Sequence, residues 1–315
     1  MNRREFLSVA SVVAVQPVTL CRASEARRPI RALVLVDFNG GNDGLNTVIP
    51  FADARYHALR PTLAIPRDQA LRIDERTGLH PALRPLMAAW HAGECAIVQG
   101  VGYAQPNRSH YRAQQIWHTA SEANEYRRDA WLARFQASQT APVHPASAPF
   151  DTRSFTTSCK AAASAIVANR AQKGVTVIRL TLDGFDTHEH QAARHASLLA
   201  QFADGIASLR SALLATADWR STLVMTRSEF GRSARENDTR GTEHGAAAPQ
   251  FVLGGAVRGG LFGEAPRLDA LDAEGGLTAD VDFRRLCATA LDGCWNVDPA
   301  TILGRPFEPL PLLRA

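Results

Sequence analysis

The sequence lacks a strong excess of charge of either sign. Its 315 residues include 35 Lys plus Arg against 31 Asp plus Glu, a formal net charge of +4, and no run of five like charges occurs. Only Lys160 and Lys173 are lysines, a bias that we attribute to genome composition rather than to arginine-specific recognition. The charge pattern therefore gives no support to a nucleic-acid partner.

Cysteines are also few. The five cysteines, at positions 21, 95, 159, 287 and 294, form neither a dense disulfide framework nor a CxxC pair. Cys287 and Cys294 are predicted to lie in a helix and its following turn, too far apart along the axis to bridge. We expect some of these residues to be buried small apolar side chains.

A long apolar run is missing as well. The longest candidate, residues 7–20, has about 14 residues, whereas a helix needs about 20 to span a bilayer, so no permanent membrane anchor is expected. The run follows Arg3 and Arg4 and precedes the small residues Ser24 and Ala26, the layout of a twin-arginine (Tat) export signal. We predict a signal peptide over residues 1–26, recognised by the Tat translocase, and a mature protein in the periplasm or outside the cell.

The chain from residue 27 to residue 315 is predicted to form a single α/β domain. Short apolar runs, typical of strands buried on both faces, occur at residues 32–36, 96–98, 175–180, 221–225 and 251–253. Helical patterns occur at residues 81–91, 110–119, 123–138, 155–171 and 191–215. This alternation predicts a three-layer sandwich with a mostly parallel central sheet. Residues 140–152, rich in Pro and Ala, are predicted to be a surface loop.

Each predicted strand has a polar cluster beside it. The candidate residues in these clusters are Asp43, Ser109, His110, Asp186, His188, His190, Glu229, Arg232 and His244. Ligands of open parallel sheets bind outside the carboxyl ends of the strands, where such residues can meet. The alternative is that these are ordinary loop residues, because loops are polar in any protein.

The strongest single pattern is Asp186, His188 and His190. Residues two apart share a side of an extended segment, and residues four apart align in a helical turn. Either arrangement brings a carboxylate to an imidazole, a combination suited to zinc, iron or manganese. Solvent-exposed polar residues or a hydrogen-bonded pair are the alternatives. His244 is open in the same way, as a ligand or as a loop hydrogen-bonding residue.

Four other candidates each have more than one interpretation. Asp43 lies in a glycine-rich stretch. Either its carboxylate supplies a hard oxygen for a divalent cation, or the stretch is a simple turn. Ser109 stands where a helix should begin, so its hydroxyl either caps backbone amides or serves as a nucleophile for a phosphate or sulfate. His110 is a base, a ligand or a surface residue. Glu229 is a ligand or a carboxylate that complements a helix dipole.

The motifs taken together resemble a known family. In order they are GGNDGLNTVIP, GLHPAL, VGYAQPNRSH, GFDTHEHQ, SEFGR, GTEHG and DFR, spread from about Ala32 to the C-terminus. This series resembles the exported bacterial family called domain of unknown function 1501. That family is similar, more remotely, to the alkaline phosphatase and sulfatase superfamily, which implies an alkaline-phosphatase-like fold with a metal site at the sheet edge.

The resemblance also implies roles for individual residues. Asp43 would match the metal aspartate after the first strand, and Ser109 the nucleophile at a helix terminus. Asp186 with His188 or His190, and later His244, would hold one metal ion, and Glu229 would bind another. Phe230 stands where the superfamily usually has a histidine, and Glu243 where the family more often has aspartate. A site with one metal ion, or one without turnover, is therefore also consistent with the motifs.

The resulting hypothesis is an exported metal-dependent hydrolase of phosphate or sulfate esters, acting on a small-molecule or glycan ester. A divalent ion (zinc, manganese, calcium or iron) would activate Ser109, with His110 nearby, and Arg232 would clamp an oxygen of the transferred group. Two other classes stay open: an exported metal-binding or assembly protein without turnover, and a redox metalloprotein, since Asp and His also suit iron.

Overall fold

The computed structural model describes residues 30–138, 144–145 and 154–314. Its centre is an eight-stranded sheet in the order β12-β5-β11-β8-β1-β7-β6, with β13 paired to β5. The strands are β1 (Ala32–Asn39), β5 (Cys95–Gly102), β6 (His144–Pro145), β7 (Thr176–Asp183), β8 (Thr222–Ser228), β11 (Ala248–Leu253), β12 (Gly260–Phe262) and β13 (Val281–Asp282). Only β11 runs antiparallel to its neighbours, so the predicted mostly parallel sheet is confirmed.

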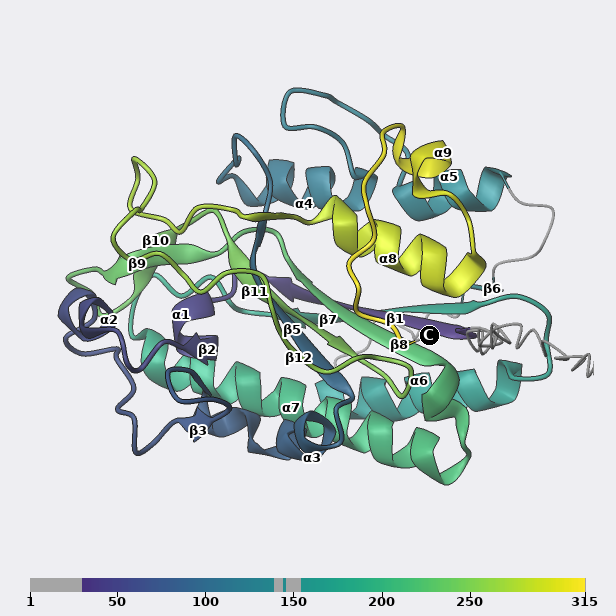
Figure 1. Cartoon of the computed structure of the whole chain (residues 1–315), viewed down its shortest axis with the longest axis horizontal. Helices are drawn as coiled ribbons and strands as arrows, with labels where there is room; N and C mark the ends of the chain where they lie inside the picture. Colours follow the sequence, from purple (N-terminus) through teal and green to yellow (C-terminus); the bar gives the residue numbers. More distant parts are fainter. Residues whose placement is uncertain (1–29, 139–143, 146–153, 315) are drawn as a thin grey trace, which may run out of the picture.

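Helices cover both faces of the sheet (Figure 1). On one face lie η1 (Pro81–Leu86), α3 (Met87–His91), α6 (Phe155–Asn169) and α7 (Gln191–Ala215). On the other lie α4 (His110–Thr119), α5 (Trp131–Ser138), α8 (Arg284–Trp295) and α9 (Pro299–Leu303). Alternate residues of β1 enter the two cores, with Val34 and Val36 on the first side and Leu33 on the second. The predicted three-layer sandwich is therefore confirmed.

Two predicted helices need comment. The helix predicted over residues 123–138 begins only at Trp131, and residues 123–130 form an irregular segment with one turn, so the first half of that prediction is wrong. The helix α7 is confirmed over Gln191–Ala215. Among the described residues, α7 alone is long and apolar enough to cross a membrane, and its buried residues Leu199, Phe202 and Ile206 pack in the core against the sheet.

The cysteines within the described part of the chain are free and buried. They are Cys95, Cys159, Cys287 and Cys294. Burial raises the pKa of Cys95, Cys159 and Cys287 to about 12 and raises that of Cys294 as well. The predicted signal peptide, residues 1–26, lies outside the described residues, and so does the predicted surface loop at 140–152 except for its residues 144–145.

The register of the central strands brings three polar segments together. Asn39 at the end of β1 aligns with Asp183 at the end of β7, and Phe38 aligns with Ser228 at the end of β8. The segments that begin at Gly40, Gly184 and Glu229 therefore leave the sheet side by side. A two-stranded hairpin follows, formed by β9 (Arg232–Glu236) and β10 (Thr242–His244), which the sequence patterns did not predict.

Candidate metal centre

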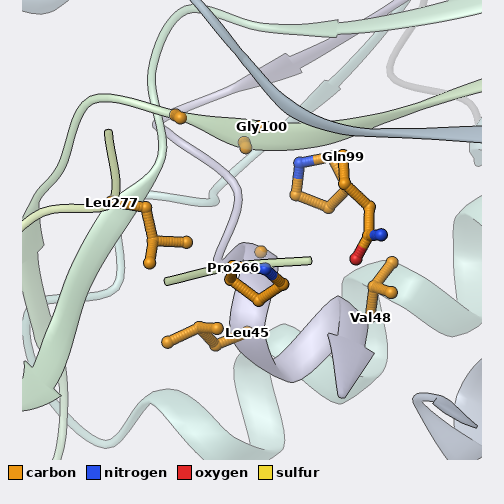
Figure 2. Close-up of a pocket in the computed structure, with 10 residues that line it drawn as sticks. Leu45, Val48, Gln99, Gly100, Pro266 and Leu277 are labelled. Atoms are coloured by element: carbon orange, nitrogen blue, oxygen red, sulfur yellow. The ribbon is translucent and has the colours of Figure 1, made fainter. Parts of the chain in front are cut away.

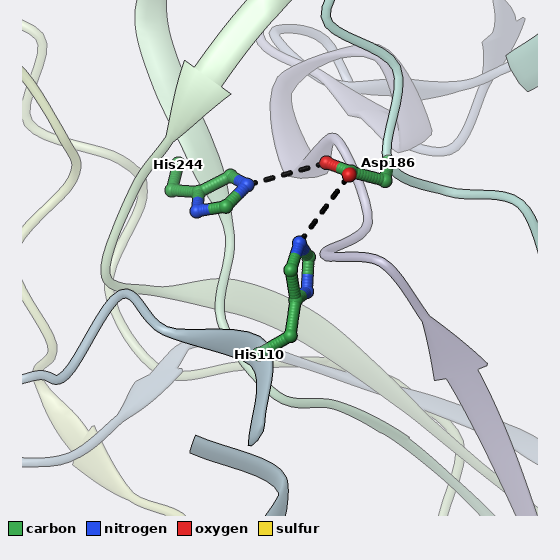
Figure 3. A group of neighbouring side chains, drawn as sticks. All are labelled: His110, Asp186 and His244. Carbon is green, nitrogen blue, oxygen red and sulfur yellow. Dashed lines mark hydrogen bonds and ion pairs between the residues drawn. The ribbon is translucent and has the colours of Figure 1, made fainter. Parts of the chain in front are cut away.

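Three histidines surround the carboxylate of Asp186. Its Oδ1 lies 3.0 Å from Nε2 of His188 and 3.2 Å from Nε2 of His244, and its Oδ2 lies 3.4 Å from Nε2 of His110. Figure 3 shows His110 and His244 approaching Asp186 from two separate segments. The Nε2 atoms of His188 and His244 are themselves 3.1 Å apart. The structure thus brings together four residues that are 134 positions apart at most along the chain, from 110 to 244.

The opposite nitrogen of each imidazole faces an oxygen. Nδ1 of His244 donates to the carbonyl of Arg108 at 2.7 Å, because a carbonyl can only accept. Nδ1 of His188 lies 3.0 Å from Oε2 of Glu243, and Nδ1 of His110 lies 3.0 Å from Oε1 of Glu229. With a hydrogen on each Nδ1, the Nε2 atom of each ring is the one that faces Asp186. An outer oxygen that orients a histidine in this way is the usual support of a metal ligand.

The pKa values in the cluster agree with this protonation pattern. Burial by itself would raise the pKa of Asp186, but the hydrogen bond and the positive charge of the Arg232 guanidinium bring it down to about 2, so the carboxylate is charged. Burial lowers the pKa of His244, which keeps its ring neutral. In Glu243, the hydrogen bond from Asn237 lowers the pKa. The cluster therefore offers an anionic oxygen and imidazole lone pairs at one point.

These residues fit a divalent metal ion. Ligands bound at about 2.0–2.1 Å to a tetrahedral zinc ion lie roughly 3.3 Å apart, close to the 3.0–3.4 Å separations between Asp186 oxygens and the three Nε2 atoms. Without a cation, lone pairs of His188 and His244 would face each other at 3.1 Å. Three imidazoles and one carboxylate suit zinc, manganese or iron better than calcium, which prefers oxygen ligands.

Close backbone packing places Asp186 at this point. Gly40 has a φ of +117°, and a Cβ there would lie 2.2 Å from the backbone nitrogen of Asp186. Only glycine therefore allows the segments after β1 and β7 to approach so closely. The side chain of Asp186 is 46% exposed, so the cluster is open to a ligand from solvent.

Ser109 lies directly beside the cluster in sequence, at the N-cap position of α4. Its side chain makes no capping hydrogen bond, so the capping interpretation is wrong. Its backbone N–H donates to Oδ1 of Asn107, which fixes the turn before the helix. The residue is exposed, and its hydroxyl stands at the positive end of a ten-residue helix.

Arg232 is not placed as predicted. Its side chain is fully buried, and its guanidinium donates to Oδ1 of Asp186 and to backbone carbonyls of Gly40, Gly41, Phe185 and Thr242. Of the five guanidinium hydrogens these acceptors leave one, on Nη1, which is too few to clamp a substrate oxygen pair bidentately. Arg232 instead holds Asp186 and ties the loops after β1 and β7 to the hairpin.

Glu229 is also placed differently from the prediction. Its side chain is 2% exposed, and Oε1 accepts from the backbone N–H of Gly40 while it contacts His110. Next to it, the ring of Phe230 packs against His110 and His244, with centroid distances of 4.9 and 4.5 Å. Glu229 therefore orients His110, and a phenyl ring lies where the resemblance implied another imidazole.

Two predicted ligands lie apart from the cluster. Asp43 is buried, and its Oδ2 is 2.6 Å from Nη1 of Arg60 and also accepts from Gln191. Burial by itself would raise the pKa of Asp43, but the Arg60 guanidinium beside it leaves the pKa lowered. His190 is exposed at the start of α7 with a φ of +44°, and its backbone N–H donates to Thr239. The structure brings neither residue to Asp186.

Sequence reasoning missed the residues that support the cluster. Glu243 lies beside His244 in the GTEHG motif, so its position was a usable signal. The carbonyl of Arg108 carried no signal, because a backbone acceptor has no motif.

A separate depression lies at the same edge of the sheet (Figure 2). Its wall includes Leu45, Val48, Pro266 and Leu277, together with the amide side chain of Gln99. None of its lining residues is titratable. This depression therefore supplies shape and apolar surface, whereas the acid–base and ligand chemistry is concentrated at Asp186.

Comparison with known proteins identifies the same family that the motifs resemble. The family model described as "Protein of unknown function (DUF1501)" matches residues 133–294. The chain belongs to this family. The family resemblance that the motifs indicated is therefore confirmed. The matched region contains Asp186, His188, Glu229 and His244. No curated protein matches the chain.

Several solved structures are similar to this DUF1501 protein. The C-terminal periplasmic domain of EcEptC from Escherichia coli, in complex with Zn, is 12% identical over 73% of this chain and 74% of that chain, with a TM-score of 0.41. The lipoteichoic acid synthase LtaP from Listeria monocytogenes is 7% identical over 84% and 72%, with a TM-score of 0.46. A protein in the alkaline phosphatase superfamily from Vibrio parahaemolyticus is 11% identical over 89% and 70%, with a TM-score of 0.44. These likenesses carry no statement about the chemistry of this chain.

Proposed function

We propose that this DUF1501 protein is an exported metal-dependent hydrolase of phosphate or sulfate esters that uses Ser109 as its nucleophile. The observation that carries the proposal is the convergence of three Nε2 atoms on Asp186, with each Nδ1 held by an oxygen on its far side. The twin arginine at Arg3 and Arg4 supports export to the periplasm or beyond.

The roles follow from the contacts. Asp186, His188, His244 and His110 would hold the ion, with Glu229 and the other oxygens orienting the rings. When bound, a divalent metal supplies Lewis acidity, which lowers the pKa of a hydroxyl and neutralises charge on a transferred group. The exposed side of Asp186 leaves room for the ester.

Ser109 is suited to attack the ester. Its uncapped hydroxyl stands at the N-terminus of α4, where backbone N–H groups and the helix dipole favour an anionic group. In the first step Ser109 Oγ bonds to the phosphorus or sulfur atom, the bond to the alcohol oxygen breaks, and the serine proton ends on the departing alcohol. In the second step water releases phosphate or sulfate and restores the hydroxyl.

The test uses the chain from Arg27, purified without chelator. Bound metals are measured by elemental analysis, and aryl phosphate and aryl sulfate esters are assayed for the wild type, Ser109→Ala and Ser154→Ala. Ser154 is the matched control, because it caps α6 by accepting from the N–H of Thr157. We expect Ser109→Ala to abolish turnover without loss of stability, and Ser154→Ala to keep turnover while losing about 1 kcal/mol of stability.

The outcomes separate the alternatives. Absence of metal together with unchanged activity of Ser109→Ala would overturn the proposal. Bound metal without turnover across the ester panel would indicate a metal-binding or assembly protein. Iron with visible absorbance would indicate a redox function.

A further inference from the structure

The hairpin turn between β9 and β10, residues 237–241, lies against the backbone that carries His188. The N–H groups of His190 and Gln191 donate to the carbonyls of Thr239 and Arg240, at 3.0 and 2.9 Å. A Cβ on Gly241 would lie 2.1 Å from the carbonyl carbon of His188. The turn therefore touches this segment at van der Waals distance and is bonded to it on the side that leads into α7.

The hydroxyl of Thr239 in this turn donates to the carbonyl of His188 at 2.7 Å, and Asn237 bonds to both that carbonyl and Glu243. Its Nδ2 donates to the carbonyl of His188 at 2.9 Å and to Oε1 of Glu243 at 2.8 Å. A carboxamide has two N–H hydrogens, so one serves each acceptor. Its Oδ1 accepts from the backbone N–H groups of Thr239 and Gly241, at 3.1 and 2.8 Å, which fixes the amide orientation.

The two acceptors of Asn237 both belong to the surroundings of His188. One is the main-chain carbonyl of His188 itself. The other is the carboxylate of Glu243, whose second oxygen lies 3.0 Å from Nδ1 of the His188 ring. Glu243 is 61% exposed at its side chain, so solvent would leave it free to rotate without Asn237. One amide therefore restrains both the backbone and the ring of His188.

We propose that Asn237 is a positioning residue of the metal centre, which holds His188 Nε2 towards Asp186 through the His188 carbonyl and Glu243. The inference rests on the metal centre of the proposed function and is independent of ester hydrolysis. Asn237 does not touch the ligand atoms, so its effect reaches the ion through His188 alone.

The test replaces the donor with an acceptor of the same shape. In Asn237→Asp, a carboxylate faces the His188 carbonyl and Glu243, so both hydrogen bonds become repulsive contacts. The control is Asp238→Asn, the opposite exchange at the neighbouring exposed position of the same turn. The probes are Zn²⁺, added in competition with a chelator, and Co²⁺, followed by its visible absorption. Amide hydrogen exchange at His190 and Gln191 reports on the turn itself.

We expect Asn237→Asp to weaken Zn²⁺ and Co²⁺ binding by about 10- to 100-fold, the usual cost of losing an outer partner of a histidine ligand. Its Co²⁺ spectrum should also change shape, and Asp238→Asn should match the wild type in both. If Asn237→Asp does not fold, Asn237→Ser, which removes the donor pair without adding charge, serves in its place.

The results distinguish this inference from the proposed function. Wild-type affinity and an unchanged Co²⁺ spectrum in the Asn237 variant would overturn the positioning role and leave the hydrolase proposal standing. Metal binding that depends on Asn237, in a protein without ester turnover, would support the positioning role and overturn the hydrolase. A wild type that binds neither ion would overturn both.

Discussion

The Nε2 atoms of His188 and His244 lie 3.1 Å apart, and each ring has its Nδ1 directed at an oxygen on its far side. With their Nδ1 hydrogens directed at these oxygens, the two rings turn their Nε2 atoms to the same point. Asp186, with a pKa of about 2, adds a negative oxygen there. This relationship is the reason to expect a cation at this point rather than a hydrogen bond between the rings.

The first prediction concerns the ligand set. Asp186→Asn should lower Zn²⁺ affinity by more than the roughly 100-fold that loss of an outer partner costs, because it removes the charge shared by all three histidines. His190→Ala, in the same segment but exposed and away from the cluster, should bind metal like the wild type. Isothermal titration with Zn²⁺ measures both, and we expect one ion per chain. Loss of binding in the His190 variant would contradict the placement of the centre.

The second prediction concerns Asp43 and Arg60, whose side chains are 1% and 0% exposed. Asp43→Asn should cost about 3–5 kcal/mol of unfolding free energy, because it leaves a buried guanidinium without its counter-charge. The control is the ion pair of the exposed Arg55 with the partly exposed Asp53, and Arg55→Gln should cost less than about 1 kcal/mol. Denaturant titration measures the stabilities, and the folded Asp43 variant should keep its metal. Reduced metal content in that variant would restore Asp43 as a ligand.

The third prediction concerns pH and His195. This ring is 1% exposed, and burial lowers its pKa to about 4. Below about pH 6.5, His195 becomes protonated in the unfolded chain but stays neutral in the folded chain. The free energy of unfolding is therefore highest above pH 6.5 and decreases as the pH falls towards 4, by at most about 1.4 kcal/mol per pH unit. His80, with a pKa also lowered to about 4 by burial, adds to the same slope.

The variants His195→Gln and His91→Gln test this pH dependence. Denaturation curves at pH 7, 6 and 5 should show that the free energy of unfolding depends less steeply on pH in His195→Gln. This variant lacks the imidazole that is protonated in the unfolded chain but not in the folded chain. His91 is exposed, so its variant should keep the wild-type slope. Equal slopes in all three proteins would refute the contribution of His195.

The fourth prediction concerns the thiols. Cys95, Cys159, Cys287 and Cys294 are buried and free, and their pKa values are raised, so the reactive thiolate is scarce. A thiol reagent at pH 8 should label the folded chain slowly and all four residues promptly in guanidinium chloride. Rapid labelling of the native protein, or fewer than four thiols after unfolding, would show an exposed or disulfide-bonded cysteine.

Local pattern was sufficient for much of the architecture. The apolar run at β1 and the stripe of Leu199, Phe202 and Ile206 along α7 each record burial, and burial follows a period that can be counted in the sequence. The residues at the sheet edge could be listed for the same reason, since parallel strands deliver their following loops to one side. His110, Asp186, His188 and His244 were therefore all candidates before any distance was known.

The sequence by itself determined the α/β class and the set of residues available at the sheet edge. Hydrophobic periodicity is a property of neighbouring residues, and the alternation of strands with helices predicts parallel strands. Only the tertiary structure decided which of them meet. Asp43 is paired with Arg60, and the guanidinium of Arg232 is bonded to four backbone carbonyls. Glu229 lies behind His110 and contacts its Nδ1. Each of these outcomes depends on a partner distant in the chain, and the charge state of a side chain is set by what lies within a few ångströms of it.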